Sequence, residues 1–266
     1  MEYLNHCIAR PEQAEKGNCA TADWFLGDCY TELESAVALG YPEDRATIFP
    51  WGIDPKRFSP GPSAVRGGIA PPEDFLMLSL RSLEPNYRVD TTIRAFLKAG
   101  AEDAAIQLMV LADGSERAAL KALAETAPAD VRRRIHWLGR KPYDELVDYY
   151  RAADLYLSSS ITDGSSVSLL EAMGCGLPVL VSDIPGNLEW VDDGKSGFLF
   201  PVGDSDAMAE RMLFLSRRRT TLRPIGASAR LRIESEADWS RNIRKITEAY
   251  ASAIRHAAGL SAGNAG

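Results

Sequence analysis

The sequence predicts an α/β fold with a doubly wound, Rossmann-like parallel sheet, and three observations support this prediction. First, short apolar runs alternate with longer amphipathic segments from residue 75 onward. Second, these runs are almost continuously apolar, which is typical of parallel strands that are buried on both faces. Third, the 266-residue chain is 45% hydrophobic and 25% charged, a composition sufficient for a globular protein with a sizeable core.

Each apolar run has the length of a strand, and most are followed by a segment with helical periodicity. The predicted strands are FLMLSL (75–80), IQLMVL (106–111), RIHWLG (134–139), DLYLSSS (154–160), PVLVSD (178–183) and GFLFPV (197–202). The predicted helices between the first four strands are 90–100, 115–126 and 142–153. A further helix is expected after each of the last three strands.

The chain outside this pattern predicts the domain organisation. Upstream, one strand (22–28) and one helix (29–42) cannot bury a core by themselves. A segment rich in Pro and Gly separates them from the main pattern. The expected parts are a remnant of an N-terminal domain with its connector (1–58), a linker (59–73), a Rossmann-like domain (74–235), and a C-terminal helix with a disordered tail (236–266).

Charge and cysteine content exclude several classes of function. The net charge of −7 argues against nucleic acid as a partner, because phosphate binding requires a basic surface. The four cysteines form no CxxC pair and have no metal-ligand spacing, which predicts a reduced, cytoplasmic protein. The polar first residues predict no signal peptide, and no apolar run approaches the ~20 residues of a membrane span. A peripheral membrane contact stays open.

Polar and glycine-rich residues follow the strands at the edge where ligands bind in open α/β sheets. Arg81 follows the first strand, and the loops 112–114, 139–141 and 158–163 follow the next three. Gly164, Ser165 and Ser166 then lead into a helix, where backbone N–H groups and the helix dipole favour an anion. The sequence therefore predicts an anion-binding site at this edge.

Glu171 is an unusual residue within that apolar helix. It lies about one and a half turns from the helix start, and helical side chains lean toward the N-terminus. Its carboxylate can accept hydrogen bonds from hydroxyls beside a phosphate, as in a ribose next to a diphosphate, and Arg81 can neutralise the phosphates. Arg81 as a surface residue, Ser165 as an N-cap and Glu171 as a paired, half-buried carboxylate are the plain alternatives. Their convergence favours a nucleotide-type ligand.

Three segments together resemble a known family. In 154–204, an acidic residue is followed by seven residues, a Glu, and then Ala-Met-x-x-Gly-x-Pro-Val. Segments 48–60 and 79–96 resemble an interdomain connector and a phosphate-contacting strand with its helix. The chain resembles the C-terminal, nucleotide-sugar-binding half of the retaining glycosyltransferases of family 4 (glycosyl transferases group 1), which have the two-domain GT-B fold.

The resemblance implies transfer of a sugar from a nucleotide diphosphate sugar to an acceptor, with the anomeric configuration kept and without a cofactor. The acceptor class stays open between a glycan, a lipid and a small molecule. By the resemblance, Asp163 would contact hydroxyls of the donor sugar and Glu171 would hold the ribose. Arg81 would bind the diphosphate, and the backbone of Gly164, Ser165 and Ser166 would line the phosphates and the sugar. Gly139 and Lys141 would face the base. The family's Lys-Gly after the phosphate arginine is absent, so Arg88 is the candidate for a second cation.

Three other functions compete with this one. Asp163 and Glu171 as a glycosidase pair would have to flank one bond, which their separation across a loop and helix disfavours. Asp204 and Asp206 suggest a metal site, but we expect them to cap a helix, with no metal needed. The third is a nucleotide-sugar-binding fragment without turnover, because most of the acceptor domain is expected to be missing. Self-association through residues near the termini is then also expected.

Overall fold

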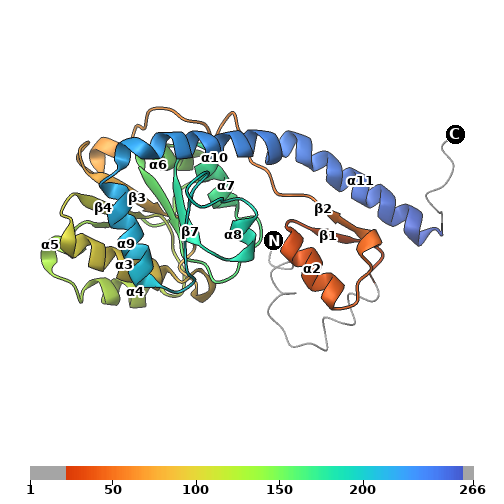
Figure 1. The fold of residues 1–266 in the computed structure, drawn as a ribbon, viewed down its shortest axis with the longest axis horizontal. Coiled ribbons are helices and arrows are strands. Elements are labelled where there is room, and N and C mark those ends of the chain that lie inside the picture. The colour runs from red at the N-terminus through yellow and green to blue at the C-terminus, as the bar shows by residue number, and fades with distance from the viewer. Residues whose placement is uncertain (1–21, 260–266) are drawn as a thin grey trace. The chain divides into compact units, whose positions relative to one another are not determined.

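The computed structural model describes residues 22–259 as two compact units (Figure 1). The larger unit consists of residues 52–238, and the smaller one combines residues up to 51 with those from 239 onward. The boundary between Trp51 and Gly52 therefore falls within the segment 48–60 that resembles an interdomain connector. The expected disordered tail and the first part of the expected N-terminal remnant lie largely outside the described residues.

The larger unit contains a six-stranded parallel sheet, as the sequence predicts. Its strand order is β5-β4-β3-β6-β7-β8, so the chain winds outward from β3, returns to pair β6 with β3, and winds outward again. This order creates a topological switch point between β3 and β6, where doubly wound sheets bind ligands. The strands are β3 (Phe75–Ser79), β4 (Ile106–Val110), β5 (Ile135–Trp137), β6 (Leu155–Ser158), β7 (Val179–Ser182) and β8 (Phe198–Phe200).

Helices cover both faces of this sheet (Figure 1). The helices α3 (Val89–Glu102), α4 (Arg117–Ala124) and α9 (Ser205–Ser216) supply apolar side chains to one buried core with the strands. The helices α6 (Leu146–Ala152), α7 (Val167–Gly174) and α10 (Leu222–Glu236) pack on the other face. The remaining helical turns of this unit are α5 (Ala129–Arg132), α8 (Pro185–Leu188), η3 (Arg66–Gly68), η4 (Pro85–Tyr87), η5 (Tyr143–Glu145) and η6 (Arg219–Thr221).

The sequence pattern does not predict α10, because this helix contains both Pro224 and Gly226. Pro224 lies in the first turn, where its missing N–H is tolerated. Gly226 permits close packing: a Cβ at this position would lie 2.0 Å from the carbonyl oxygen of Gly176, just beyond the end of α7. Tertiary contact with α7 thus overrides weak helix propensity.

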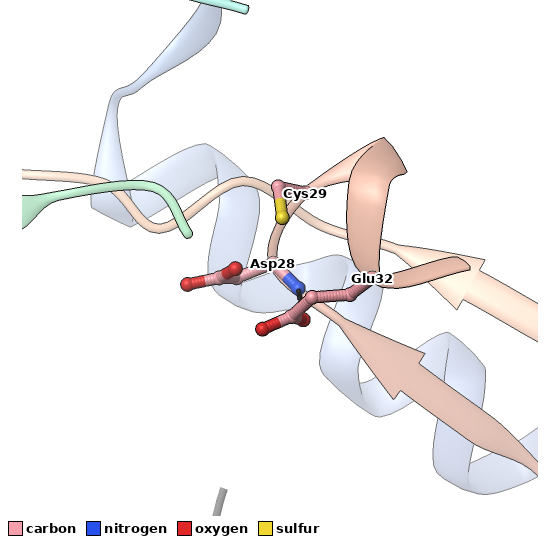
Figure 2. A group of neighbouring side chains, drawn as sticks. All are labelled: Asp28, Cys29 and Glu32. Carbon is pink, nitrogen blue, oxygen red and sulfur yellow. Dashed lines mark hydrogen bonds between the residues drawn. The ribbon is translucent and has the colours of Figure 1, made fainter. Parts of the chain in front are cut away.

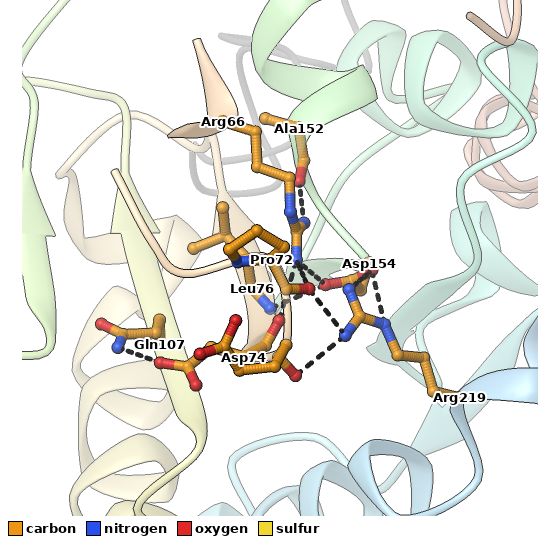
Figure 3. A network of polar contacts seen from close by, with 9 residues as sticks. Arg66, Pro72, Asp74, Leu76, Gln107, Ala152, Asp154 and Arg219 are labelled. Carbon is orange, nitrogen blue, oxygen red and sulfur yellow. Dashed lines mark hydrogen bonds and ion pairs between the residues drawn. The ribbon is translucent and has the colours of Figure 1, made fainter. Parts of the chain in front are cut away.

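Asp154 anchors the amino-terminal edge of the sheet, opposite the predicted site (Figure 3). Its carboxylate accepts hydrogen bonds from Arg66 (Nη2–Oδ2, 3.0 Å), Arg219 (Nη2–Oδ1, 2.7 Å) and the backbone N–H of Leu76 (2.9 Å). Arg66 also donates to the carbonyl oxygen of Ala152. The segment 59–73, which the sequence presents as a linker, is therefore held within the larger unit.

The smaller unit joins the two ends of the described chain. Strands β1 (Phe25–Gly27) and β2 (Ala46–Ile48) form a parallel pair, accompanied by α2 (Tyr30–Ala38), η2 (Glu43–Arg45) and the long helix α11 (Trp239–Ala257). Asn242 of α11 donates to the carbonyl oxygen of Pro50 (3.0 Å), and the rings of Trp51 and Trp239 stack 6.1 Å apart. The C-terminal helix thus belongs structurally with the N-terminal segment.

The helix α11 keeps an apolar stripe at its surface. Ile243, Tyr250 and Ile254 recur at helical spacing, and Tyr250 and Ile254 are 63% and 69% exposed. Polar residues such as Arg241 and Arg244 are also exposed, whereas Asn242 and Ala249 are buried. Within residues 22–259, no helix combines the length and the apolar character needed to cross a membrane.

We expect Asp154→Ala to lower the free energy of unfolding by about 3 kcal/mol, because it leaves two partly buried guanidinium groups without their shared carboxylate. Chemical denaturation of the chain followed by circular dichroism measures this change. The control is Glu125→Ala, which removes an exposed ion pair with Arg132 and is expected to leave the unfolding midpoint unchanged. Equal stability of the Asp154 variant and the parent would contradict the anchoring role.

Candidate functional site

The loops that follow β3, β6 and β7 meet at the carboxyl edge of the sheet and are bonded to one another. The hydroxyl of Ser159, after β6, donates to the carbonyl oxygen of Arg88 (2.7 Å), in the segment after β3. The hydroxyl of Ser182, at the end of β7, donates to the carbonyl oxygen of Ser160 (2.6 Å). These buried bonds hold the three loops in a fixed arrangement at the switch point.

Arg81 is the centre of the polar cluster at this edge. Its Nη2 donates to Oδ2 of Asp163 (2.6 Å), and its Nη1 donates to the hydroxyls of Ser168 (3.0 Å) and Ser166. The ring of Tyr87 covers the guanidinium, with its centroid 4.1 Å from Cζ. The Nε–H is buried and has no hydrogen-bond partner among the described residues. A buried donor of this kind has unused capacity to bind an anion.

The loop from Asp163 to Ser166 is packed tightly before α7. A Cβ on Gly186 of α8 would lie 2.3 Å from the carbonyl oxygen of Asp163, so only glycine permits this approach. The indole N–H of Trp190 donates to the hydroxyl of Ser165 (3.2 Å). Ser166 occupies the N-cap position, but its side chain forms no capping bond. The helix α7 begins at the carboxyl edge of the sheet, so its first N–H groups point toward the edge where Arg81 lies.

Glu171 is buried on α7, with 2% of its surface exposed. The hydroxyl of Tyr150 donates to its Oε2 (2.8 Å), whereas its Oε1 is buried without a partner among the described residues. Burial raises the pKa of Glu171, and the bond from Tyr150 opposes this shift only in part. Ser168 and Glu171 are three residues apart, so they share one face of α7 and connect the Arg81 cluster to this carboxylate.

Asp163 and Tyr143 show how strongly burial controls the site. Burial raises the pKa of Asp163, although the neighbouring Arg81 lowers it. Burial and the nearby Glu171 carboxylate raise the pKa of Tyr143 to about 12. Tyr143 therefore stays a neutral hydroxyl beside Glu171 at physiological pH.

Three predicted residues lie outside the Arg81 cluster. Gly139 takes a φ of +66° in the turn after β5, and Lys141 places its ammonium 5.7 Å from the ring centre of Tyr149. The strand β5 lies two strands from β3, roughly 10 Å across the sheet. Arg88, at a φ of +44°, donates from Nε to Asp90 (2.9 Å) and forms an ion pair with it.

Several residues of the site are not predicted from the sequence pattern. Arg81 interacts with Tyr87, Tyr156 and Ser168, Glu171 with Tyr150, and Asp163 with Gly186. The hydroxyls of Tyr156 and Ser168 lie 2.8 Å apart, which extends the polar chain along α7. Of these residues, Gly186 alone is marked by its neighbours in the sequence, because it follows Pro185 at the start of α8. The tyrosines belong to apolar segments, where core packing is the usual explanation.

Two acidic clusters contain side chains of the types that bind metal ions. Asp204 accepts hydrogen bonds from the backbone N–H groups of Asp206 (3.0 Å) and Ala207 (2.9 Å), which confirms its predicted role as a helix cap. Asp28, Cys29 and Glu32, at the start of α2, have ligand atoms within 4.8 Å of one another (Figure 2). The carboxylate of Glu32 accepts a hydrogen bond from the backbone N–H of Asp28 (3.1 Å), so it satisfies a backbone donor just before α2 begins.

The six-stranded sheet with its switch point has the architecture of a doubly wound α/β domain of the GT-B type, and the buried polar cluster at its carboxyl edge is the candidate site. The family model described as glycosyl transferases group 1 matches residues 66–232, and the chain belongs to this family. This match includes every site residue described above from Arg81 to Trp190.

Individual relatives agree with this assignment. The D-inositol 3-phosphate glycosyltransferase of Nocardia farcinica is 30% identical over 261 residues, which is 95% of this chain and 57% of that protein. The amylovoran biosynthesis glycosyltransferase AmsK of Erwinia amylovora is 28% identical over 218 residues, 80% of this chain and 52% of that protein. The chain thus spans about half the length of these relatives.

Solved structures share the fold. Sucrose-phosphate synthase from Thermosynechococcus elongatus aligns with a TM-score of 0.82 at 20% identity, over 93% of this chain and 63% of that one. Anabaena Alr3699/HepE, solved in complex with UDP, aligns with a TM-score of 0.80 at 20% identity, over 92% of this chain and 70% of that one.

We expect Glu171→Gln to make the chain more stable than the parent at pH 7, measured without nucleotide. The folded state raises the pKa of Glu171 above its ordinary value of 4.5, so ionisation at neutral pH costs folding free energy that the amide does not. The gain should vanish as the pH falls below 4.5, where the carboxyl group is protonated in both states. Denaturation midpoints across this range measure it, and a less stable variant at pH 7 would show that the fold depends on the carboxylate.

Proposed function

We propose that the chain binds a nucleotide diphosphate sugar at the carboxyl edge of its sheet and donates the sugar as part of a metal-independent, retaining glycosyltransferase of family 4. The observation that carries the proposal is the buried Oε1 of Glu171, which has no partner among the described residues and shares a helix face with the Arg81 cluster. A buried carboxylate oxygen is costly to leave unpaired, so it indicates a hydrogen-bonding ligand. Family membership supports this choice.

The diphosphate is proposed to bind between Arg81 and the start of α7. Arg81 supplies a buried guanidinium that matches phosphate oxygens in a bidentate manner. The backbone of Gly164, Ser165 and Ser166 leads into the positive end of the helix dipole, which favours the same anion. UDP is present in the Anabaena HepE structure of the same fold, which supports UDP as the first nucleotide to test.

The nucleoside is proposed to extend from the diphosphate along α7. Glu171 would accept hydrogen bonds from the ribose hydroxyls, while Tyr150 holds its other oxygen. The loop at Gly139 and Lys141 lies on the same edge of the sheet and continues toward Tyr143, beside Glu171, so it is the proposed contact for the base. Asp163 would contact hydroxyls of the donor sugar beyond the diphosphate.

We expect Glu171→Gln to weaken UDP or GDP binding about tenfold, because a charge-assisted acceptor for the ribose becomes a neutral one. Isothermal titration calorimetry with both nucleotides measures the effect. Glu125→Gln, at an exposed ion pair, is the matched control and should bind like the parent. Since the Glu171 variant is also expected to be more stable, a loss of affinity cannot be attributed to unfolding. Unchanged affinity would remove Glu171 from the ribose site.

We expect nucleotide binding to persist in the presence of EDTA. In the proposal, Arg81 and the N-terminus of α7 balance the phosphate charge, so no divalent cation is required. Titrating UDP into the chain with EDTA, and then with magnesium or manganese, compares the dissociation constants directly. A strict requirement for either metal would contradict this arrangement of charges.

A further inference from the structure

The contact between Arg81 and Asp163 has a consequence for how an anion enters the site. The Nε and Nη2 atoms of Arg81 form one edge of the guanidinium fork, the edge that binds an oxyanion through two parallel bonds. Asp163 occupies Nη2 at 2.6 Å, whereas the buried Nε–H has no partner among the described residues. A phosphate can use both donors only if Asp163 gives up Nη2.

The negative charge of Asp163 also disfavours an anion at Arg81. Asp163 and Arg81 are both largely buried, so their charges are weakly screened. A diphosphate brought to Arg81 would lie beside the Asp163 carboxylate, and like charges at this range repel strongly. The other contacts of Arg81, from Ser166, Ser168 and the Tyr87 ring, are neutral and do not compete as anions.

We propose that Asp163 is an internal competitor for Arg81, which a diphosphate displaces when it binds. This inference rests on the proposed function, because it requires the diphosphate to reach Arg81. Displacement frees the carboxylate while the diphosphate is in place, so Asp163 becomes available to sugar hydroxyls only in the donor complex. When the diphosphate leaves, Asp163 returns to Arg81, which weakens retention of the nucleotide product.

The test is the affinity of Asp163→Asn for UDP, UMP and uridine, measured by calorimetry. Asparagine keeps a hydrogen-bond acceptor for Arg81 but removes the competing charge, so we expect UDP to bind about tenfold more tightly than to the parent. UMP should gain less, and uridine should gain nothing, because the effect follows phosphate charge. Asp206→Asn is the control, since it removes the same charge from an exposed ion pair and should leave all three affinities unchanged.

Two outcomes separate this inference from the proposed function. If the parent binds UDP and Asp163→Asn binds it equally or more weakly, Asp163 supports Arg81 instead of competing with it, and only the inference falls. If the parent binds neither UDP nor GDP, the proposed function falls as well.

Should the variant fail to fold, the parent provides a second measurement. Nuclear magnetic resonance of the carboxyl carbon of Asp163 and the guanidinium of Arg81 should show both signals moving together as UDP is added. If only the Arg81 signal moved, Asp163 would not be displaced by the diphosphate, and the inference would be wrong.

Discussion

The pairing of β3 with β6 is the constraint on which the candidate site depends. Its register places Ser79 opposite Leu157, so the chain leaves both strands at the same edge. Parallel neighbours lie about 4.8 Å apart, and the loops that follow them can therefore exchange side-chain contacts. Arg81 reaches the loop before α7 for this reason, although some eighty residues separate the two segments. If the sheet were wound in one direction only, β4 and β5 would lie between β3 and β6. Arg81 would then be too far from the loop before α7 to contact it.

The two edges of the sheet differ in how completely their charged groups are satisfied. At the amino edge, Asp154 is surrounded by donors from Arg66, Arg219 and the backbone, a complete network suited to holding the fold together. At the carboxyl edge, Arg81 retains a buried donor and Glu171 a buried acceptor without partners among the described residues. Incomplete satisfaction of buried polar groups costs stability, and it is expected where a ligand completes the network.

This incompleteness links stability to function in the same residues. Burial raises the pKa values of both Asp163 and Glu171, so each carboxylate is held in an environment that disfavours its charge. Arg81 compensates Asp163 directly, whereas Glu171 is stabilised by neutral tyrosine hydroxyls and by the more distant charge of Arg57. The site can thus offer charge to a ligand only because the surrounding fold is stable enough to keep carboxylates largely shielded from water.

The sequence by itself determined the parallel sheet, the alternation of its strands with most of its helices along the chain, and the position of Glu171 inside a helix behind a glycine-serine loop. These features depend on local periodicity and on burial, which are visible in any one segment. Tertiary structure alone decided that Arg81 pairs with Asp163 and that α10 forms despite its proline and glycine. Such choices depend on which partners the packed chain brings within reach, because a charged side chain selects among donors and acceptors that are far apart in sequence.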